Sequence, residues 1–164
     1  MQATLARTAR DLCEGLRGRA MPAENLHITL AFLGERTAEQ RACMEAAADG
    51  VAAESFELHF NEVRYVSRRE ILWLGTGQLP PPLLGLVKRL SSALMACGYE
   101  PEHRPFQAHV TLMRKLHHPP RVPLTADLHW PVEQFALVRS ELTRAGAIYT
   151  VLRRWPLTGS GVQG

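Results

Sequence analysis

Two short runs of the chain carry the same arrangement of histidine and threonine, N-L-H-I-T-L at 25–30 and A-H-V-T-L-M at 108–113. Side chains alternate along a strand, so His27 and Thr29 share one face, as do His109 and Thr111. Two imidazoles can perform acid–base work near neutral pH, because histidine's ordinary pKa of about 6.5 lets one ring hold a proton while the other lacks it. A threonine hydroxyl beside each ring can donate to a phosphate oxygen. The pattern favours metal-free phosphodiester chemistry.

A single strand histidine is more often structural than catalytic, and it is the duplication that favours the catalytic interpretation. Threonine is common in strands anyway, so each threonine gains meaning only beside its histidine. Arg114 and Lys115 follow the second motif and offer cations to a phosphate. Regular alternation puts position 115 on the histidine face, so contact from Arg114 requires a twist or bulge, and a solvated strand end is an equal interpretation of Lys115.

Aromatic residues near the motifs are candidate contacts for a base, because aromatic faces stack on unpaired nucleotides. Phe32 and Phe106 are the candidates, although core packing is favoured for Phe32. Tyr149 is either a further substrate contact or an ordinary strand tyrosine. Arg104, beside His103, is an additional candidate for phosphate. The five histidines outside the motifs show no metal-ligand spacing and are assigned to the surface or to loops: His59, His103, His117, His118 and His129.

Composition narrows the class of protein without identifying it. The 164 residues fit one domain with its own core, and no apolar run approaches the roughly 20 residues of a membrane span. A net charge of +3 and a pI near 9.0 support a polyanionic partner only weakly. Cys13, Cys43 and Cys97 lack C-x-x-C spacing, so we expect reduced thiols. The N-terminus lacks a signal-like apolar core, which favours the cytoplasm.

Hydrophobic periodicity and turn residues divide the chain into alternating helices and strands. Thr37 and Gln40 form a predicted capping box at the start of the second helix, and Gly98 ends the third. Helix followed by motif strand occurs twice, which suggests two related halves. The predicted elements are helices at 3–17, 38–49 and 83–94; strands at 25–33, 55–65, 71–74, 133–142 and 147–155, with the second motif strand; a loop at 117–131; and a loose tail at 159–164.

Paired H-x-T motifs about eighty residues apart, in the runs N-L-H-I-T-L-A-F-L-G and H-V-T-L-M-R-K with the tail I-Y-T-V-L-R-R-W-P-L, resemble the 2H phosphoesterase superfamily. Within it the chain is similar, from about Leu5 to Leu157, to bacterial LigT-like RNA 2′,3′-cyclic phosphodiesterases, also called 2′-5′ RNA ligases. The resemblance implies one α+β domain over 1–158, with two lobes of antiparallel sheet and flanking helices around a central cleft with a pseudo-twofold axis. It also implies a strand before the first helix, for which Met1-Gln2-Ala3 is too short, so this strand is expected to be missing.

The resemblance implies hydrolysis of RNA 2′,3′-cyclic phosphate ends to 2′-phosphomonoesters, with 2′-5′ ligation as the reverse reaction. It implies His27 as proton donor and His109 as proton acceptor, and it favours Arg114 as the basic contact. We expect no metal or cofactor, an RNA end or cyclic nucleotide as substrate, no membrane partner and a monomer. A non-enzymatic RNA-binding module on the same fold is the alternative. A metal-dependent hydrolase is a third hypothesis, which lacks clustered carboxylates.

Overall fold

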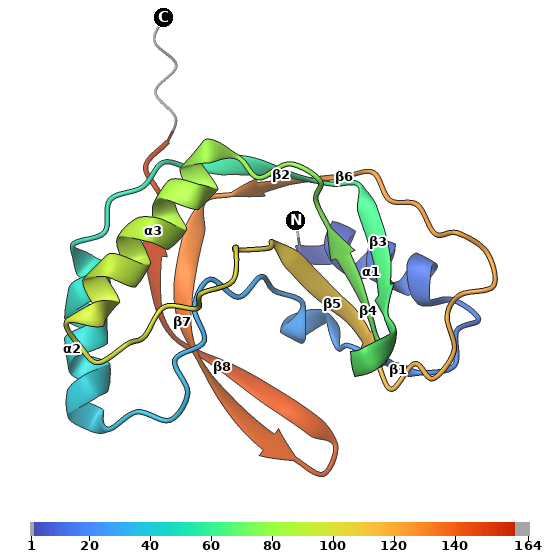
Figure 1. The fold of residues 1–164 in the computed structure, drawn as a ribbon, viewed down its shortest axis with the longest axis horizontal. Coiled ribbons are helices and arrows are strands. Elements are labelled where there is room, and N and C mark those ends of the chain that lie inside the picture. Colours follow the sequence, from blue (N-terminus) through green and yellow to red (C-terminus); the bar gives the residue numbers. More distant parts are fainter. Residues whose placement is uncertain (1, 160–164) are drawn as a thin grey trace, which may run out of the picture. The chain divides into compact units, whose positions relative to one another are not determined.

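The computed structural model describes residues 2–159, and within them the chain forms three α-helices and eight strands (Figure 1). The chain divides into two compact units, each assembled from three separate segments. Unit 1 contains residues 1–28, 57–79 and 107–130. Unit 2 contains residues 29–56, 80–106 and 131–164. Both histidines of the two motifs therefore belong to unit 1.

Unit 1 is built on a four-stranded antiparallel sheet. Its strands lie in the order β1 (Arg19–Ala20), β5 (His109–Arg114), β4 (Ile71–Gly75) and β3 (Glu62–Val66). The predicted hairpin between β3 and β4 is confirmed, with Val66 opposite Ile71. Helix α1 contacts β5 and ends before Gly15, which adopts a left-handed conformation at φ 75°. The elements of unit 1 are α1 (Gln2–Cys13), β1 (Arg19–Ala20), a 3-10 turn (Ala23–Asn25), β3 (Glu62–Val66), a second 3-10 turn (Ser67–Arg69), β4 (Ile71–Gly75) and β5 (His109–Arg114).

The core of unit 1 lies on the face of the sheet that is opposite the motif histidine of β5. Leu72 and Leu74 of β4 are buried there together with Val110 and Leu112 of β5. Leu74 is directly opposite Val110, so their side chains stand on the same face. This burial fixes which residues of β5 remain on the other face.

The predicted strand at 25–33 is wrong, although its alternation of side chains is present. Residues 26–33 form no strand, because a strand requires a neighbour to complete its ladder and this segment pairs with none of the described strands. Even so, His27 and Thr29 are exposed while Ile28 and Leu30 are partly buried. The buried Leu26 anchors the segment.

The predicted strand at 55–65 is interrupted at Asn61, and its two halves belong to different sheets. The first half is β2 (Phe56–Phe60), which pairs with β6 (Leu128–Val132) in a two-stranded sheet, and the second half is β3. The predicted loop at 117–131 is thus wrong at its end, where β6 begins. The prolines of this segment indicated a loop. The strand was not predicted, because its partner strand lies about seventy residues earlier in the chain.

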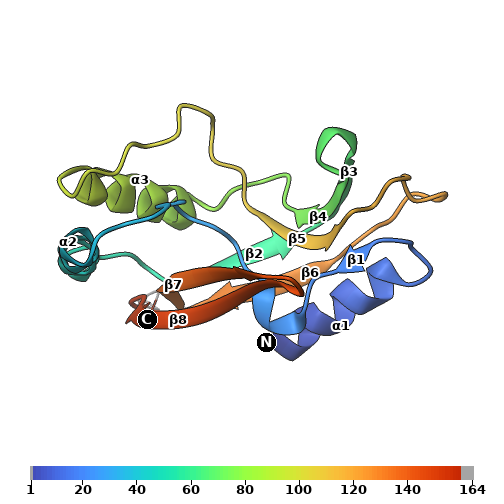
Figure 2. The same ribbon diagram turned by 90° about the horizontal axis from the view of Figure 1, so that it is seen from below.

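Unit 2 packs the helices α2 (Ala38–Asp49) and α3 (Pro81–Met95) against each other and against a long hairpin (Figure 2). The predicted capping box of α2 is confirmed, with Gln40 N donating to Thr37 Oγ1 at 3.1 Å and Thr37 N donating to Gln40 Oε1 at 3.0 Å. The predicted pair of C-terminal strands is confirmed as well, and 160–164, the end of the expected tail, lies outside the described residues. The elements of unit 2 are α2 (Ala38–Asp49), α3 (Pro81–Met95), β7 (Gln134–Thr143) and β8 (Gly146–Pro156).

The core of unit 2 joins the apolar faces of α2 and α3 to the hairpin. Met44 and Leu94 are buried within it, as is Phe135 of β7, which stacks on Trp155 of β8 with ring centroids 5.3 Å apart. Trp155 Nε1 also donates to Asp49 Oδ1 at 2.8 Å, which ties the hairpin to the end of α2.

The expectation of three reduced thiols is wrong for two of them. Cys43 of α2 and Cys97, just after α3, form a disulfide with a Cα–Cα distance of 5.7 Å. Their separation of 54 residues gives no local signal, because only the packing of α2 on α3 brings the two side chains together. Cys13 is a free, half-buried thiol.

Candidate active site

The second motif presents its polar residues as predicted. On β5, His109 and Thr111 are half-buried. Val110, which lies between them, is 0% exposed, and Leu112, which follows Thr111, is 1% exposed. His109 is opposite Gly75 of β4. The apolar face fixes the strand, so the imidazole and the hydroxyl stand together on the face away from the core.

Both motif histidines are held by the same hydrogen bond to their own backbone. His27 Nδ1 lies 2.6 Å from the carbonyl oxygen of Asn25, and His109 Nδ1 lies 3.1 Å from the carbonyl oxygen of Gln107, in each case two residues earlier. A carbonyl oxygen can only accept, so Nδ1 must be the protonated, donating nitrogen. In the neutral ring, Nε2 then carries the lone pair, so each histidine can take up or release a proton at Nε2.

A bulge at the end of β5 decides on which face of the strand Arg114 lies. Leu72 of β4 is opposite Met113, but the next residue of β4, Trp73, is opposite Thr111, so Leu112 is the extra residue. Leu112 and Met113 are consequently both buried. The shift returns Arg114 to the face of His109 and Thr111.

Lys115 adopts a different conformation from the strand that precedes it. Its φ of 53° is left-handed, so the strand ends there. The next amide, of Leu116, donates to Glu70 O at 2.9 Å. Of the two predicted cations, the backbone therefore directs only Arg114 along the histidine face.

Arg19 of β1 is a further cation at this end of the sheet, and the sequence reasoning missed it. It is directly opposite Arg114 across the β1–β5 ladder, and both side chains are exposed. Like charges placed opposite each other destabilise a strand pair, so this pair concentrates positive charge where an anion would relieve the repulsion. Only the pairing of the two-residue β1 brings Arg19 here.

Trp73 and Gly75 form the wall beside His109, and the sequence reasoning missed them as well. The Trp73 ring lies 5.3 Å from the His109 ring at an interplanar angle of 43°. It leans over Gly75, where an added Cβ would lie 2.1 Å from Trp73 Cζ3. Arg64 Cζ lies 5.5 Å from the centre of the same indole. The sequence signal that could have indicated this wall is a glycine two residues after a tryptophan in an apolar strand.

The remaining candidates lie in unit 2. Thr29 is exposed, Phe106 is half-buried, and Tyr149 is half-buried on β8 opposite Ser140. Phe32 is 78% exposed, so the preference for core packing at this position is wrong. An aromatic ring this exposed contributes little to the core and leaves its face accessible.

The thiol of Cys13 has a clearly displaced pKa. Burial raises the pKa of its thiol from 9.0 to about 11, and Sγ lies 3.9 Å from Leu112 O, on the core side of β5. At neutral pH this group is a neutral thiol, which is a poor nucleophile. Cys13 therefore offers no thiolate nucleophile at neutral pH.

Comparisons with known proteins show the family to which the chain belongs. The family model described as the 2′-5′ RNA ligase superfamily matches residues 2–144. The chain is 35% identical over 143 residues to the RNA 2′,3′-cyclic phosphodiesterase of Escherichia coli K12, covering 86% of this chain and 81% of that protein. It is 34% identical over 154 residues to the protein of the same name from Thermus thermophilus, covering 86% and 76%.

Solved structures show the same fold. The crystal structure of E. coli LigT complexed with 3′-AMP has a TM-score of 0.84 at 31% identity, covering 96% of this chain and 91% of that chain. The structure of E. coli LigT complexed with phosphate has a TM-score of 0.81 at 29% identity, covering 95% and 92%. The mixed fold of antiparallel sheets and helices expected from the sequence is confirmed.

Proposed function

We propose, from the premise that this chain belongs to the 2′-5′ RNA ligase superfamily, that it hydrolyses RNA 2′,3′-cyclic phosphate ends to 2′-phosphomonoesters with His27 and His109 as the acid–base pair. The chain is a cyclic phosphodiesterase of that family. The observation that carries the mechanism is the repeated Nδ1 hydrogen bond to the carbonyl two residues earlier. It leaves Nε2 of each ring as the atom that exchanges protons.

In the proposed reaction, water attacks phosphorus as the bond from phosphorus to the 3′ oxygen breaks. His109 Nε2 takes the proton of the attacking water, and His27, protonated at Nε2, gives its proton to the departing 3′ oxygen. The product carries a 2′-phosphate and a 3′-hydroxyl. Each proton transfer contributes about 10²–10⁴-fold. The assignment of donor and acceptor comes from the family resemblance, since the two rings have matching hydrogen bonds.

Phosphate recognition in unit 1 is assigned to Thr111 and Arg114. Both lie on the face of His109, Thr111 by strand alternation and Arg114 by the bulge. A hydrogen bond from a charged guanidinium to an anionic oxygen contributes about 1.5–3 kcal/mol. Lys115, just past the strand end, is assigned to the more distant charge of the RNA backbone.

Unit 2 supplies the other proposed substrate contacts, each argued from its own residue. Thr29 follows His27 by two positions in an extended segment and is assigned to phosphate. Phe32 offers an exposed ring for stacking on a base, which is worth about 1–3 kcal/mol. Phe106 and Tyr149 are half-buried aromatic residues assigned to the nucleoside.

The proposed mechanism needs no metal or cofactor, since imidazole supplies both proton transfers. We further propose that the enzyme acts as a monomer in the cytoplasm. Disulfides are uncommon in reducing compartments, so the thiol state of Cys43 and Cys97 in protein taken directly from cells tests that location. No helix among residues 2–159 is long and apolar enough to cross a bilayer.

The test uses a short RNA ending in a 2′,3′-cyclic phosphate, in excess EDTA, with wild type, His27→Ala and His109→Ala. We expect a 2′-phosphate product from the wild type and a loss of about 10²–10⁴-fold in each variant, with RNA binding retained. A wild type that binds the RNA without turning it over would instead support the binding-module alternative. Activity that EDTA abolishes and added metal restores would support a metal-dependent hydrolase.

A further inference from the structure

Two of the histidines assigned to the surface meet on the small sheet formed by β2 and β6. His59 of β2 and His129 of β6 stack with ring centroids 4.2 Å apart and an interplanar angle of 11°. Asp127, just before β6, places Oδ1 at 2.6 Å from His59 Nε2 and at 3.8 Å from His129 Nε2. The cross-strand pairing thus brings together three possible ligand atoms that linear spacing does not reveal.

We propose that His59, Asp127 and His129 form a binding site for a divalent transition-metal ion such as Ni²⁺, Zn²⁺ or Cu²⁺. Two imidazoles with one carboxylate are a donor set suited to these ions, whereas Mg²⁺ and Ca²⁺ prefer oxygen ligands alone. One ligand atom from each residue lies within 4.8 Å of the others. Metal–nitrogen bonds of about 2.1 Å require ligand atoms about 3.4 Å apart, so shifts of about 1 Å are needed. His59 Nε2, which donates to Asp127 Oδ1 in the metal-free protein, releases its proton to solvent when it binds the ion.

Glu57 supplies the outer contact that such sites commonly have. Its Oε1 lies 2.8 Å from His129 Nδ1, and a carboxylate can only accept this hydrogen bond. The proton is therefore held on Nδ1, and Nε2, the atom that faces Asp127, is left with the lone pair that binds metal. Metal-binding histidines commonly donate their other nitrogen to a carboxylate in this way, which sets the ring's orientation.

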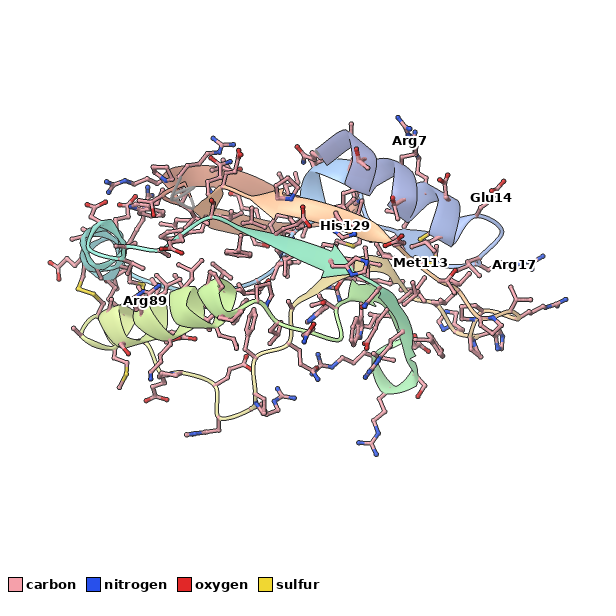
Figure 3. All side chains as sticks on the ribbon, turned by 90° about the horizontal axis from the view of Figure 1, so that it is seen from above. Arg7, Glu14, Arg17, Arg89, Met113 and His129 are labelled. Atoms are coloured by element: carbon pink, nitrogen blue, oxygen red, sulfur yellow. A yellow bond between two sulfur atoms is a disulfide. The ribbon has the colours of Figure 1, made fainter. Side chains whose placement is uncertain are left out.

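The exposure of the cluster leaves the ion an open path and room for water ligands. The side chains of His59 and His129 are 44% and 56% exposed, and that of Asp127 is 82% exposed. In Figure 3, His129 of β6 lies beside β2. Because the three residues come from β2, β6 and the segment before β6, bound metal would also cross-link the two strands.

Titration of the metal-free full-length protein with Ni²⁺ tests the proposal directly. Calorimetry should show saturable binding at this site in the wild type and at least a tenfold weaker affinity in His59→Ala, His129→Ala and Asp127→Asn. Ni²⁺ is paramagnetic, so the amide NMR signals of 57–60 and 127–130 should broaden first. Mg²⁺ added at the same concentration should leave these signals unchanged.

His117→Ala is the matched control, because His117 also pairs with a carboxylate, Glu70 Oε1 at 2.9 Å, but belongs to no cluster of three possible metal ligands among the described residues. This variant should bind Ni²⁺ like the wild type. A second control, the double variant His27→Ala/His109→Ala, removes the motif histidines and should also bind normally. Wild-type affinity in His59→Ala and His129→Ala, or broadening centred on residues 27 and 109, would overturn the proposal and leave a hydrogen-bonded surface cluster only.

Discussion

Gly75→Ala is expected to disturb the site through Trp73 without adding any chemical group to it. A Cβ at Gly75 would lie 2.1 Å from Trp73 Cζ3, 2.9 Å from Cε3 and 3.2 Å from Cη2. Ordinary contact begins near 3.4 Å, so the indole must retreat by about 1.3 Å. Because the same ring lies 5.3 Å from the His109 ring, the methyl group displaces the wall against which His109 rests.

The expected loss of kcat/KM has two sources, the weakened contact between the Trp73 and His109 rings and the displacement of His109. An aromatic pair of this kind is worth about 0.5–1.5 kcal/mol, which corresponds to about 2–10-fold, and displacing a reacting group by about 1 Å can cost up to about 10²-fold. We therefore expect kcat/KM for a 2′,3′-cyclic phosphate RNA to fall by about tenfold and by no more than about 10²-fold. Overpacking should lower the free energy of unfolding by about 1–3 kcal/mol.

A double-mutant cycle with Trp73→Ala isolates the cause. Without the indole, the methyl group has no ring to displace, so Gly75→Ala should have little further effect on kcat/KM. Gly77→Ala is the matched control, because the atom nearest its Cβ would be the flexible end of Glu62, at 3.0 Å, and Asn61 Oδ1 would be in ordinary contact at 3.9 Å. The reasoning fails if Gly75→Ala keeps wild-type kcat/KM, or if it costs as much in the Trp73→Ala background as alone.

Three further predictions concern Arg114, the disulfide and Cys13. Arg114→Ala should lower kcat/KM by about 10–10²-fold while Lys115→Ala changes it less than about threefold, and equal losses in steady-state assays would contradict the bulge argument. Reducing the Cys43–Cys97 bond, which closes a loop of 54 residues, should lower the free energy of unfolding in urea by up to about 4 kcal/mol; an oxidised protein no more stable than Cys43→Ala/Cys97→Ala would refute this. Because burial raises the pKa of Cys13 to about 11, a thiol reagent at pH 8 should label Cys13 far more slowly in the native protein than in the protein unfolded in urea. The neutral thiol contributes to the free energy of unfolding below pH 9, and this contribution should be lost as the pH rises toward 11. Rapid labelling of the native protein would contradict both expectations.

The sequence predicted elements whose residues interact with near neighbours. The capping box of Thr37 and Gln40 and the hairpin of β7 and β8 are local features, and the structure confirms them. The polar face of β5 was predictable for the same reason, since alternation over a few residues decides it. The need for a bulge before Arg114 was also visible in the sequence, because regular alternation placed that residue on the wrong face.

Features that depend on distant pairing were not predictable from one sequence. The segment that carries His27 alternates like a strand, and no local signal tells that it pairs with no other strand. The meeting of Cys43 with Cys97, of Arg19 with Arg114, and of His59 with His129 each requires the register or packing of elements far apart in the chain. The sequence reasoning missed Trp73 because the position of its indole depends on Gly75. A side chain at residue 75 would keep the indole away from His109.

The protonation of the two motif histidines provides the most direct test of the proposed mechanism. With ¹⁵N-labelled histidine, NMR at a pH where the rings are neutral reports which ring nitrogen holds the proton, and His27→Ala and His109→Ala assign the signals. Both rings should carry the proton on Nδ1 and leave Nε2 unprotonated, as the carbonyl oxygens of Asn25 and Gln107 require. A proton on Nε2 of either neutral ring would contradict the arrangement on which the proposed proton transfers depend.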